Sequence, residues 1–250
     1  RLLPQANGLE HAIDGFTIRL RAQRRSEHTI SAYMRDLKCF ALTLSDVDLA
    51  DITPAMIDST LTNPLVTCSE NGSPKSAATI YRQNAALRSF FAWAIETGKT
   101  ESSPVKSITT KRLSRKPPKF LTVSEKRRLL KEVHDRANPL ARRDRVILEM
   151  FLGTGIRIAE LVNLDIDHVD LDGKHIRIMG KGGIPQVKFL KSSLRTLLRS
   201  YLKERRRLAS AEVTALFISS RGTRLCCRQV AQRLAHWLGK AGIHKNITPH

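Results

Sequence analysis

Two cations stand in glycine-rich settings that suit the binding of a phosphate group. Arg157 follows the glycine-rich residues 153–155, near the start of a helix expected over residues 158–164. Glycines let the backbone approach a ligand closely, a guanidinium donates two parallel hydrogen bonds to phosphate oxygens, and a helix start adds partial positive charge. Lys181 lies in the turn of residues 180–183, where an ammonium group can reach into a phosphate site. Together the two cations predict chemistry at a phosphate.

Two neighbouring residues leave alternatives open at this site. Glu160 follows Arg157 by three positions and lies on the same helical face, so it either orients the guanidinium or is an ordinary solvated carboxylate. Lys188, on the last of three expected strands, is the competitor of Lys181, and we favour Lys181.

The charge balance predicts a polyanionic partner. There are 43 Lys and Arg against 23 Asp and Glu, a formal charge of +20, and such a charge repels itself unless a polyanion is near. Nucleic acid is the leading partner, because each phosphate that Lys or Arg neutralises releases a condensed counterion. An anionic membrane is disfavoured, since no apolar run approaches the roughly 18 residues of a spanning helix and no signal pattern appears.

The cysteines and the small motifs predict neither a metal nor a nucleotide. Cys39, Cys68, Cys226 and Cys227 do not form the paired spacing of a zinc site, and no glycine-rich nucleotide motif of the G-x-x-x-x-G-K type occurs. We therefore expect no cofactor. The cysteine usage also suits a reducing, cytoplasmic compartment.

The expected elements give a mostly α fold with a small antiparallel β-sheet. Apolar residues recur at helical spacing over residues 26–44 and 76–97, a weaker helix spans 11–24, and Thr53-Pro54 opens a short one. Further on, Thr122 and Glu125 form a capping-box pattern that begins helices running to Leu152. Strands are expected over 168–171, 174–179 and 186–190, with a tight turn at Asp172-Gly173, and helices over 192–208 and 227–239.

A basic segment separates the helical part from the mixed part. Residues 103–120 carry six cations and no acidic residue from Lys106 to Lys119, beside three prolines that suppress helix. We predict a helical DNA-binding domain over residues 1–102, a basic interdomain linker over 103–120, and a catalytic domain over 121–250 that is incomplete at its C-terminal side.

Several segments, in order along the chain, resemble the tyrosine recombinase or phage-integrase family, most closely its compact Xer-type members. GTGIRIAEL at residues 153–161 is similar to the motif of the family's first catalytic arginine, and GKGG at 180–183 is similar to the turn of its catalytic lysine. ITPH at 247–250 resembles the start of the H-x-x-R box. SEHTISAYMRDLKCF and SAATIYRQNAALRSFFAWAIETGK resemble the helical core-binding domain, and PPKFLTVSEKRRLL resembles the passage between domains.

The resemblance implies a SAM-like core-binding domain, a mixed α/β catalytic domain and DNA strand exchange through a 3′-phosphotyrosine. Arg157 is matched to the catalytic arginine, Lys181 to the general acid that protonates the leaving 5′ oxygen, and His250 to the histidine of the box. The second arginine and the nucleophilic tyrosine of the family lie beyond His250. Tyr33, Tyr81 and Tyr201 do not match the nucleophile's context, so we expect residues 1–250 to bind DNA without cleaving it.

The expected partner is double-stranded DNA carrying a specific recombination site, and the resemblance implies a homotetramer on two such sites. No membrane and no nucleotide partner is expected. The DNA contacts are assigned to basic residues of both domains and of the linker: Arg35, Arg82, Arg88, Arg112, Arg115, Lys119, Arg228 and Arg233.

Two other functions remain open from the sequence. A non-catalytic DNA-binding regulator, or a degenerate recombinase, would keep the DNA-binding parts without the chemistry; an arginine three residues after His250 and a later tyrosine would favour the enzyme. A type IB topoisomerase shares the chemistry but relaxes supercoils independently of site. We rank it lower, because the short helical N-terminal domain is Xer-like.

Overall fold

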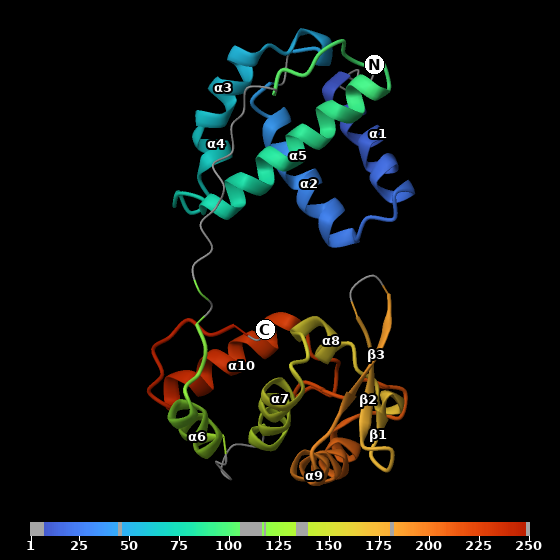
Figure 1. Cartoon of the computed structure of the whole chain (residues 1–250), viewed down its shortest axis with the longest axis vertical. Coiled ribbons are helices and arrows are strands. Elements are labelled where there is room, and N and C mark those ends of the chain that lie inside the picture. Colours follow the sequence, from blue (N-terminus) through green and yellow to red (C-terminus); the bar gives the residue numbers. More distant parts are fainter. Residues whose placement is uncertain are drawn as a thin grey trace. The chain divides into compact units, whose positions relative to one another are not determined.

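A computed structural model describes residues 8–44, 47–105, 117, 119–133, 140–180 and 183–248 (Figure 1). The chain divides into two compact units, Arg1–Lys116 and Pro117–His250. The border between the units falls inside the segment predicted as a linker, while the exact domain limits given above stay predictions. Within the described ranges, no helix combines the length and the apolar character needed to cross a membrane.

The first unit is built from helices, three of which are capped at their N-termini by hydroxyl side chains. Its elements are α1 (Gly8–Ala22), α2 (Glu27–Ala41), the 3₁₀ helix η1 (Leu49–Asp51), α3 (Pro54–Thr62), α4 (Pro64–Thr67) and α5 (Ala77–Glu96). Ser26, Thr53 and Ser76 accept hydrogen bonds from amides in the first turns of α2, α3 and α5, which fixes where these helices begin.

Aromatic side chains fill the core of the first unit. Phe16 of α1 contacts Phe90 and Trp93 of α5 with ring centroids 5.6 Å apart in both pairs. Phe40 of α2 belongs to the same buried cluster. The predicted helical stripes therefore face one another, as their spacing requires.

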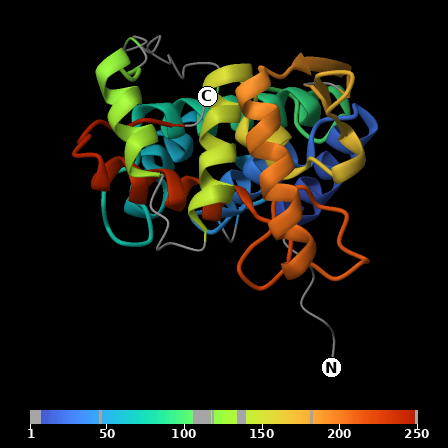
Figure 2. The same ribbon diagram turned by 90° about the horizontal axis from the view of Figure 1, so that it is seen from below.

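The second unit combines helices with a small sheet. Its elements are α6 (Val123–Glu132), α7 (Ala141–Thr154), α8 (Ile158–Val162), η2 (Ile166–His168), β1 (Val169–Asp170), β2 (His175–Met179), β3 (Pro185–Phe189), α9 (Ser192–Leu208) and α10 (Cys227–Lys240). The predicted capping box of Thr122 and Glu125 is present at the start of α6. α7 and α9 pack side by side (Figure 2). The predicted fold class, mostly α with a small antiparallel sheet, is confirmed.

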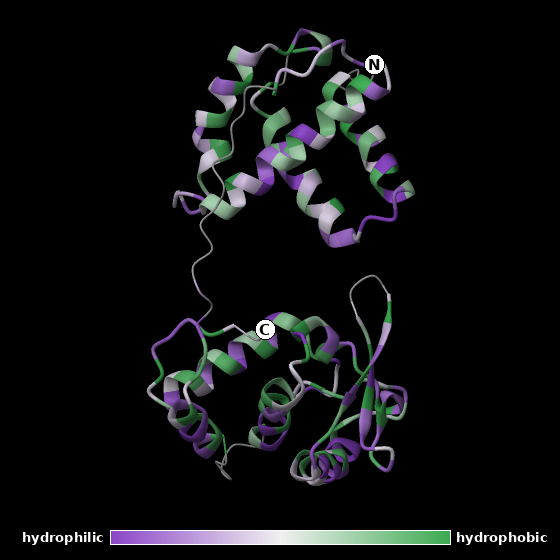
Figure 3. Cartoon of the chain, viewed as in Figure 1, coloured by the Kyte–Doolittle hydropathy of each residue, from purple (hydrophilic) through white to green (hydrophobic). Residues whose placement is uncertain are grey.

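The sheet has the order β1-β2-β3 and both pairs are antiparallel. Ile176 and Ile178 of β2 are buried in the core of the unit, whereas Arg177 and Met179 alternate to the exposed face. Figure 3 shows the corresponding division between hydrophobic and hydrophilic residues on the elements of this unit. One face of the sheet thus supports the core and the other faces outward.

The predicted tight turn at Asp172-Gly173 is wrong in its geometry. Asp170 pairs with His175, so residues 171–174 form a four-residue connection between β1 and β2. The Asp170 carboxylate accepts hydrogen bonds from the amides of Asp172 and Gly173, which stabilises the wider loop. The left-handed conformation falls on Lys174, with φ of 61°, rather than on the glycine.

Candidate functional site

Arg157 lies in the sharp connection between α7 and α8. Gly155 ends α7 in the left-handed conformation, with φ of 62°, and its amide donates to the carbonyl of Phe151 at 3.1 Å. A side chain at this position would be strained, which accounts for the glycine. Arg157 follows in an extended conformation as the N-cap of α8, and 60% of its side chain is exposed. The local sequence therefore presents the guanidinium to solvent.

The predicted contribution of a helix start at Arg157 is not supported. α8 has five residues and ends at Val162, short of the predicted residue 164. A helix this short has a weak dipole, and the Arg157 amide already donates to Glu160 Oε2 at 2.9 Å. An anion at the start of α8 would therefore be attracted by the Arg157 guanidinium and not by the helix dipole.

Glu160 holds Arg157 and is not a solvated carboxylate, which decides between the two alternatives left open by the sequence. Arg157 Nη1 donates to Glu160 Oε1 at 2.7 Å, and the Glu160 side chain is only 8% exposed. Burial acts to raise the pKa of Glu160, but the hydrogen bonds from the Arg157 amide and guanidinium outweigh it, so the pKa is lowered. For Nε and Nη2 of Arg157, the described residues provide no acceptor, so this side of the fork is available to a ligand.

Lys188 lies near this ion pair. It pairs with Ile176 on the core-facing side of the sheet, is half-buried, and its charge contributes to lowering the pKa of Glu160. The sheet therefore approaches the start of α8. Lys181 lies outside the described residues, but its flanks are defined: the Gly180 amide donates to the Ile184 carbonyl at 2.8 Å and closes the end of the hairpin.

His250 also lies outside the described residues, whereas Ile247 and Thr248 lie within them. Ile247 and Thr248 line a cavity of about 250 Å³ whose wall also includes Ile156, the residue that precedes Arg157. Ile247 packs against the cluster that contains Leu129 and Trp237. The chain leading to His250 is thus tied to the part of the unit that carries Arg157.

The predicted DNA contacts of the first unit differ in their surroundings. Arg35 is exposed on α2, and Arg88 on α5 is half-buried. Arg82 donates to the Asp36 carboxylate and, at 3.2 Å, to the Ala32 carbonyl. Asp36 is only 5% exposed, and burial raises its pKa although Arg82 opposes the shift. Arg82 therefore neutralises a buried carboxylate inside the unit.

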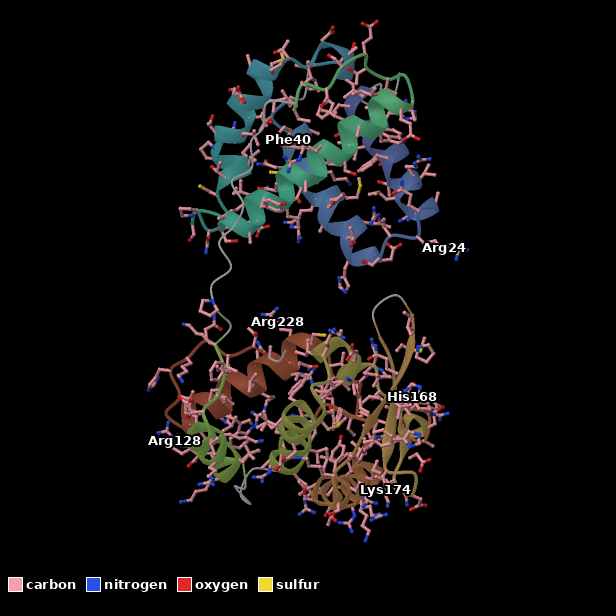
Figure 4. The ribbon with its side chains drawn as sticks, in the orientation of Figure 1. Arg24, Phe40, Arg128, His168, Lys174 and Arg228 are labelled. Carbon is pink, nitrogen blue, oxygen red and sulfur yellow. The ribbon has the colours of Figure 1, made fainter. Side chains whose placement is uncertain are left out.

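The predicted contacts of the second unit also divide into free and engaged cations. Lys119 and Arg228 are exposed, and Figure 4 shows Arg228 at the surface, in the first turn of α10. Arg233 instead donates to the buried Asp144 carboxylate at 2.6 Å and lies over the Trp237 ring. Arg112 and Arg115 lie outside the described residues. Whether any of these cations contacts DNA stays a prediction.

The sequence did not reveal the buried network around Asp144. This carboxylate accepts hydrogen bonds from Arg143, Arg233 and Trp237, and it joins α7 to α10. The signal that could have indicated this network is Asp144 itself, a charged residue inside the apolar stripe of α7. Asp165, Asp167 and His168 also lie together, but Asp165 accepts from Arg224 and Thr214 and its amide donates to His168 Nδ1. Asp165 and His168 thus already have partners within the protein.

Comparison with known proteins identifies close relatives along the whole chain. Residues 13–98 match the phage integrase N-terminal SAM-like domain, and residues 119–250 match the phage integrase family. The chain is 33% identical to tyrosine recombinase XerC of Vibrio cholerae over 99% of its own length and 78% of that protein. It is also 33% identical to the XerC of Serratia marcescens, over 100% of this chain and 80% of the relative.

Two solved structures share the fold. A lambda integrase (residues 75–356) dimer bound to a COC′ core site has a TM-score of 0.71 at 20% identity, covering 95% of this chain and 82% of that one. XerH site-specific recombinase bound to palindromic difH substrate has a TM-score of 0.69 at 23% identity, covering 96% and 68%. At these identities the likeness bears on the fold alone.

Proposed function

The chain belongs to the phage integrase family of tyrosine recombinases, and we propose that it recognises a specific double-stranded DNA site for cutting and rejoining through a 3′-phosphotyrosine intermediate. In this reaction a tyrosine oxygen attacks the phosphorus, a phosphotyrosine bond forms, and the bond to the 5′ oxygen breaks. The phosphotyrosine conserves the energy of the phosphodiester, and attack by a 5′ hydroxyl reverses the step. No nucleotide is consumed.

The observation that carries this proposal is the exposed guanidinium of Arg157, held from one side by Glu160. Its Nη1 is fixed at 2.7 Å from the Glu160 carboxylate, which leaves the other edge of the fork for phosphate oxygens. The charge that develops on the non-bridging oxygens in the transition state is stabilised by such a preorganised donor. Arg157 therefore binds the scissile phosphate in our proposal.

Lys181 supplies the proton to the departing 5′ oxygen. An unperturbed lysine is charged at neutral pH, as a proton donor here must be. One support is the hydrogen bond between Gly180 and Ile184, which closes the end of the hairpin. The other is Lys188 of the same hairpin, whose charge helps to lower the pKa of Glu160. Lys188 is half-buried on the core side of the strand, which disfavours it as the acid.

His250 bonds a phosphate oxygen or assists proton transfer at the attacking tyrosine. Its support is the cavity wall that Ile247 and Thr248 share with Ile156. Only Pro249 separates Thr248 from His250 in the sequence.

None of the three tyrosines in residues 1–250 is the nucleophile in this proposal. Tyr201 is 3% exposed, its hydroxyl donates to the Leu216 carbonyl, and burial raises its pKa to about 12. Tyr33 packs against the core of the first unit, and Tyr81 stands on the outer side of α5 in that unit. The 250-residue chain accordingly binds DNA without forming a covalent adduct.

Site recognition uses both units and the segment between them. We assign the domains as residues 1–102, 103–120 and 121–250, with DNA contacts from Arg35, Lys119 and Arg228 and from Arg112 and Arg115 of the linker. Arg82 and Arg233 are weaker candidates, because each already binds a buried carboxylate. We propose four copies on two DNA sites as the assembly; among the proteins of the same fold, lambda integrase forms a tetramer bound to a Holliday junction.

The test is trapping of a covalent protein–DNA adduct on denaturing gels. The DNA site is first selected from random duplexes by its affinity for the 250-residue chain, and nicked versions of the site serve as substrates. A form of the protein that continues beyond His250 should yield the adduct. Arg157→Ala and Lys181→Ala should lower its rate of formation by about 100- to 1000-fold.

Three outcomes decide against parts of the proposal. An undiminished adduct with Arg157→Ala would contradict the role of that residue. An adduct formed by the 250-residue chain would place the nucleophile among Tyr33, Tyr81 and Tyr201. Relaxation of supercoiled plasmids without recombinant products, on DNA lacking the selected site, would favour a topoisomerase instead.

A further inference from the structure

A line of cations runs along the exposed side of α9. We call it the α9 stripe and define it by its members: Arg195, Arg199, Lys203, Arg206 and Arg207. All of these side chains are exposed except Arg195, which is half-buried. The three- and four-residue spacing places the stripe within an arc of about 120° at 100° per residue. The spacing of these cations is visible in the sequence, and the proposed phosphate site does not use them.

The opposite side of α9 is fixed in the core, so the stripe must face outward. Leu194, Leu198 and Tyr201 are at most 3% exposed and belong to the main core cluster of the unit. Arg205 is also buried, and it donates to the carbonyls of Ala215 and Val213. Arg205 is therefore structural and is not part of the stripe.

The carboxylates near the α9 stripe are already paired. Glu204, the one acidic residue of α9, lies 2.9 Å from Arg142 of α7, and Asp172 lies 3.5 Å from Arg199. For Lys203, Arg206 and Arg207, the described part of the chain offers neither a hydrogen-bond acceptor nor an ion-pair partner. Lys174 adds another exposed cation in the loop that Arg195 and Arg199 contact. The surface keeps a net positive charge.

Stabilisation of the helix does not account for this arrangement. Cations in the last turn of a helix complement its dipole, which explains Arg206 and Arg207. It does not explain Arg195 and Arg199, which stand in the first half of α9. Like charges four residues apart destabilise a helix. A bound ligand with regularly spaced negative charges would offset the repulsion between the cations of the α9 stripe.

The C-terminal half of the α9 stripe, with Lys203, Arg206 and Arg207, lies away from the Arg157 site. α9 runs antiparallel to α7, because Leu194 is the side chain nearest Gly153 at one end and Arg142 donates to Ser200 at the other. Arg157 follows the C-terminal end of α7, whereas Lys203, Arg206 and Arg207 lie toward its N-terminal end. The twelve helical steps from Arg142 to Thr154 separate these ends by roughly 18 Å.

We propose that the α9 stripe is a second contact surface for double-stranded DNA, separate from the phosphate site of Arg157. From Arg195 to Arg206 the stripe extends over about 17 Å, which matches about five phosphates of one strand at 3.4 Å each. An anionic membrane fits poorly, since Leu208 is the single large apolar side chain exposed on α9. The inference rests on the proposed function only in taking DNA as the polyanion.

The experiment measures binding of the 250-residue chain to a 40-base-pair duplex of random sequence over a series of salt concentrations. The variant carries Lys203→Gln, Arg206→Gln and Arg207→Gln. The control carries Arg127→Gln, Arg128→Gln and Lys131→Gln, which removes equal charge from exposed positions of α6 in the same unit. The α9 variant should lose at least about tenfold in affinity, and its salt slope should fall by about 2.7 for three lost phosphate contacts. The control should stay close to the original chain.

A second readout locates the contact directly. Acetylation of Lys203 by a water-soluble reagent, followed by mass spectrometry, should slow in the presence of the duplex, whereas that of Lys131 should not. Equal losses in the α9 and α6 variants, or unchanged reactivity of Lys203, would overturn the inference. The random duplex contains no recombination site, so failure of the proposed cleavage chemistry leaves this result unaffected.

Discussion

At the scale of single residues, the proposed role of Arg157 depends on its contacts with Glu160. One of its oxygens accepts from the Arg157 guanidinium and the other from the Arg157 amide, so the carboxylate fixes both the backbone and the side chain of that residue. An arginine held in this way loses little freedom when a phosphate arrives, which is the benefit of preorganisation. We therefore expect Glu160 to act as a positioning residue for Arg157.

Replacing Glu160 should change how the stability of the protein depends on pH. The folded pKa of Glu160 lies below its ordinary 4.5, so the stabilisation it provides is complete above about pH 4.5 and is lost as pH falls through the lowered value. We expect Glu160→Gln to unfold more easily than the original chain at pH 7, by up to about 1 kcal/mol. The difference should vanish toward pH 3 in urea denaturation. A difference independent of pH would contradict the ion pair; Asp172→Asn, at a fully exposed carboxylate, is the control.

Tyr201 should matter for stability and not for chemistry. Its hydroxyl donates to Leu216 and accepts from the Ile218 amide, both buried. Tyr201→Phe leaves these two backbone groups unsatisfied, which should cost about 1–3 kcal/mol in urea denaturation. The yield of covalent adduct in the longer form of the protein should not change. Loss of the adduct with normal stability would make Tyr201 a candidate nucleophile.

The sequence predicted the residue types of the site better than their partners. Arg157 and its possible link to Glu160 were predicted because both lie within one turn. Arg82 and Arg233 were taken as surface cations, since helical periodicity places a residue on a face. It cannot reveal a carboxylate that lies 46 or 89 positions away in the chain, as Asp36 and Asp144 do.

At the scale of elements, the buried Asp144 carboxylate is what attaches α10 to α7. It accepts from Arg143 on its own helix and from Arg233 and Trp237 on α10. α10 leads toward Ile247 and His250, so this attachment also sets where the end of the described chain lies. A charged group is tolerated inside the unit because its donors satisfy it.

Removing this carboxylate should be strongly destabilising. Asp144→Ala leaves the guanidinium groups of Arg143 and Arg233 without their partner in a buried place, and we expect a loss of about 3–5 kcal/mol in chemical denaturation. Hydrogen exchange at the α10 amides should accelerate. The control is Glu204→Gln, which breaks a surface pair with Arg142 and should cost below about 1 kcal/mol. Similar losses for the two variants would contradict the proposed attachment.

Elements with local signals were predicted well, and those with distant partners were not. The capping box at Thr122 and the helix over 192–208 depend on neighbouring residues, and the structure has both. The bridges of Asp165 with Ala215 and of Ile218 with Arg224 were not predicted, because one joins residues 50 positions apart and neither has strand periodicity. The short helix α4 was likewise missed.

At the scale of the whole molecule, each unit has its own core. The cluster of the first unit contains buried residues from Leu9 to Val105, and the two clusters of the second contain residues from Leu129 to Ile243. No cluster among the described residues draws on both units. Since each unit buries its apolar surface independently, each should be able to fold alone.

Separate expression tests this independence. We expect residues 1–116 and 117–250 each to give a cooperative thermal transition by circular dichroism. Neither fragment should approach the DNA affinity of the intact chain, because linked contacts act at a high effective concentration. A fragment that melts without cooperativity would show that its unit requires the other.

The central claim is that Arg157 acts on the charge of the scissile phosphate, and a binding cycle tests it most directly. The affinity of the 250-residue chain for its selected site is measured with a phosphodiester or with one neutral methylphosphonate at the cleavage position, for the original chain and for Arg157→Ala. We expect each change alone to weaken binding about tenfold, and both together to weaken it no further, since they remove the same charge-assisted hydrogen bonds. If the two losses multiply, Arg157 does not contact that phosphate and the assigned site is wrong.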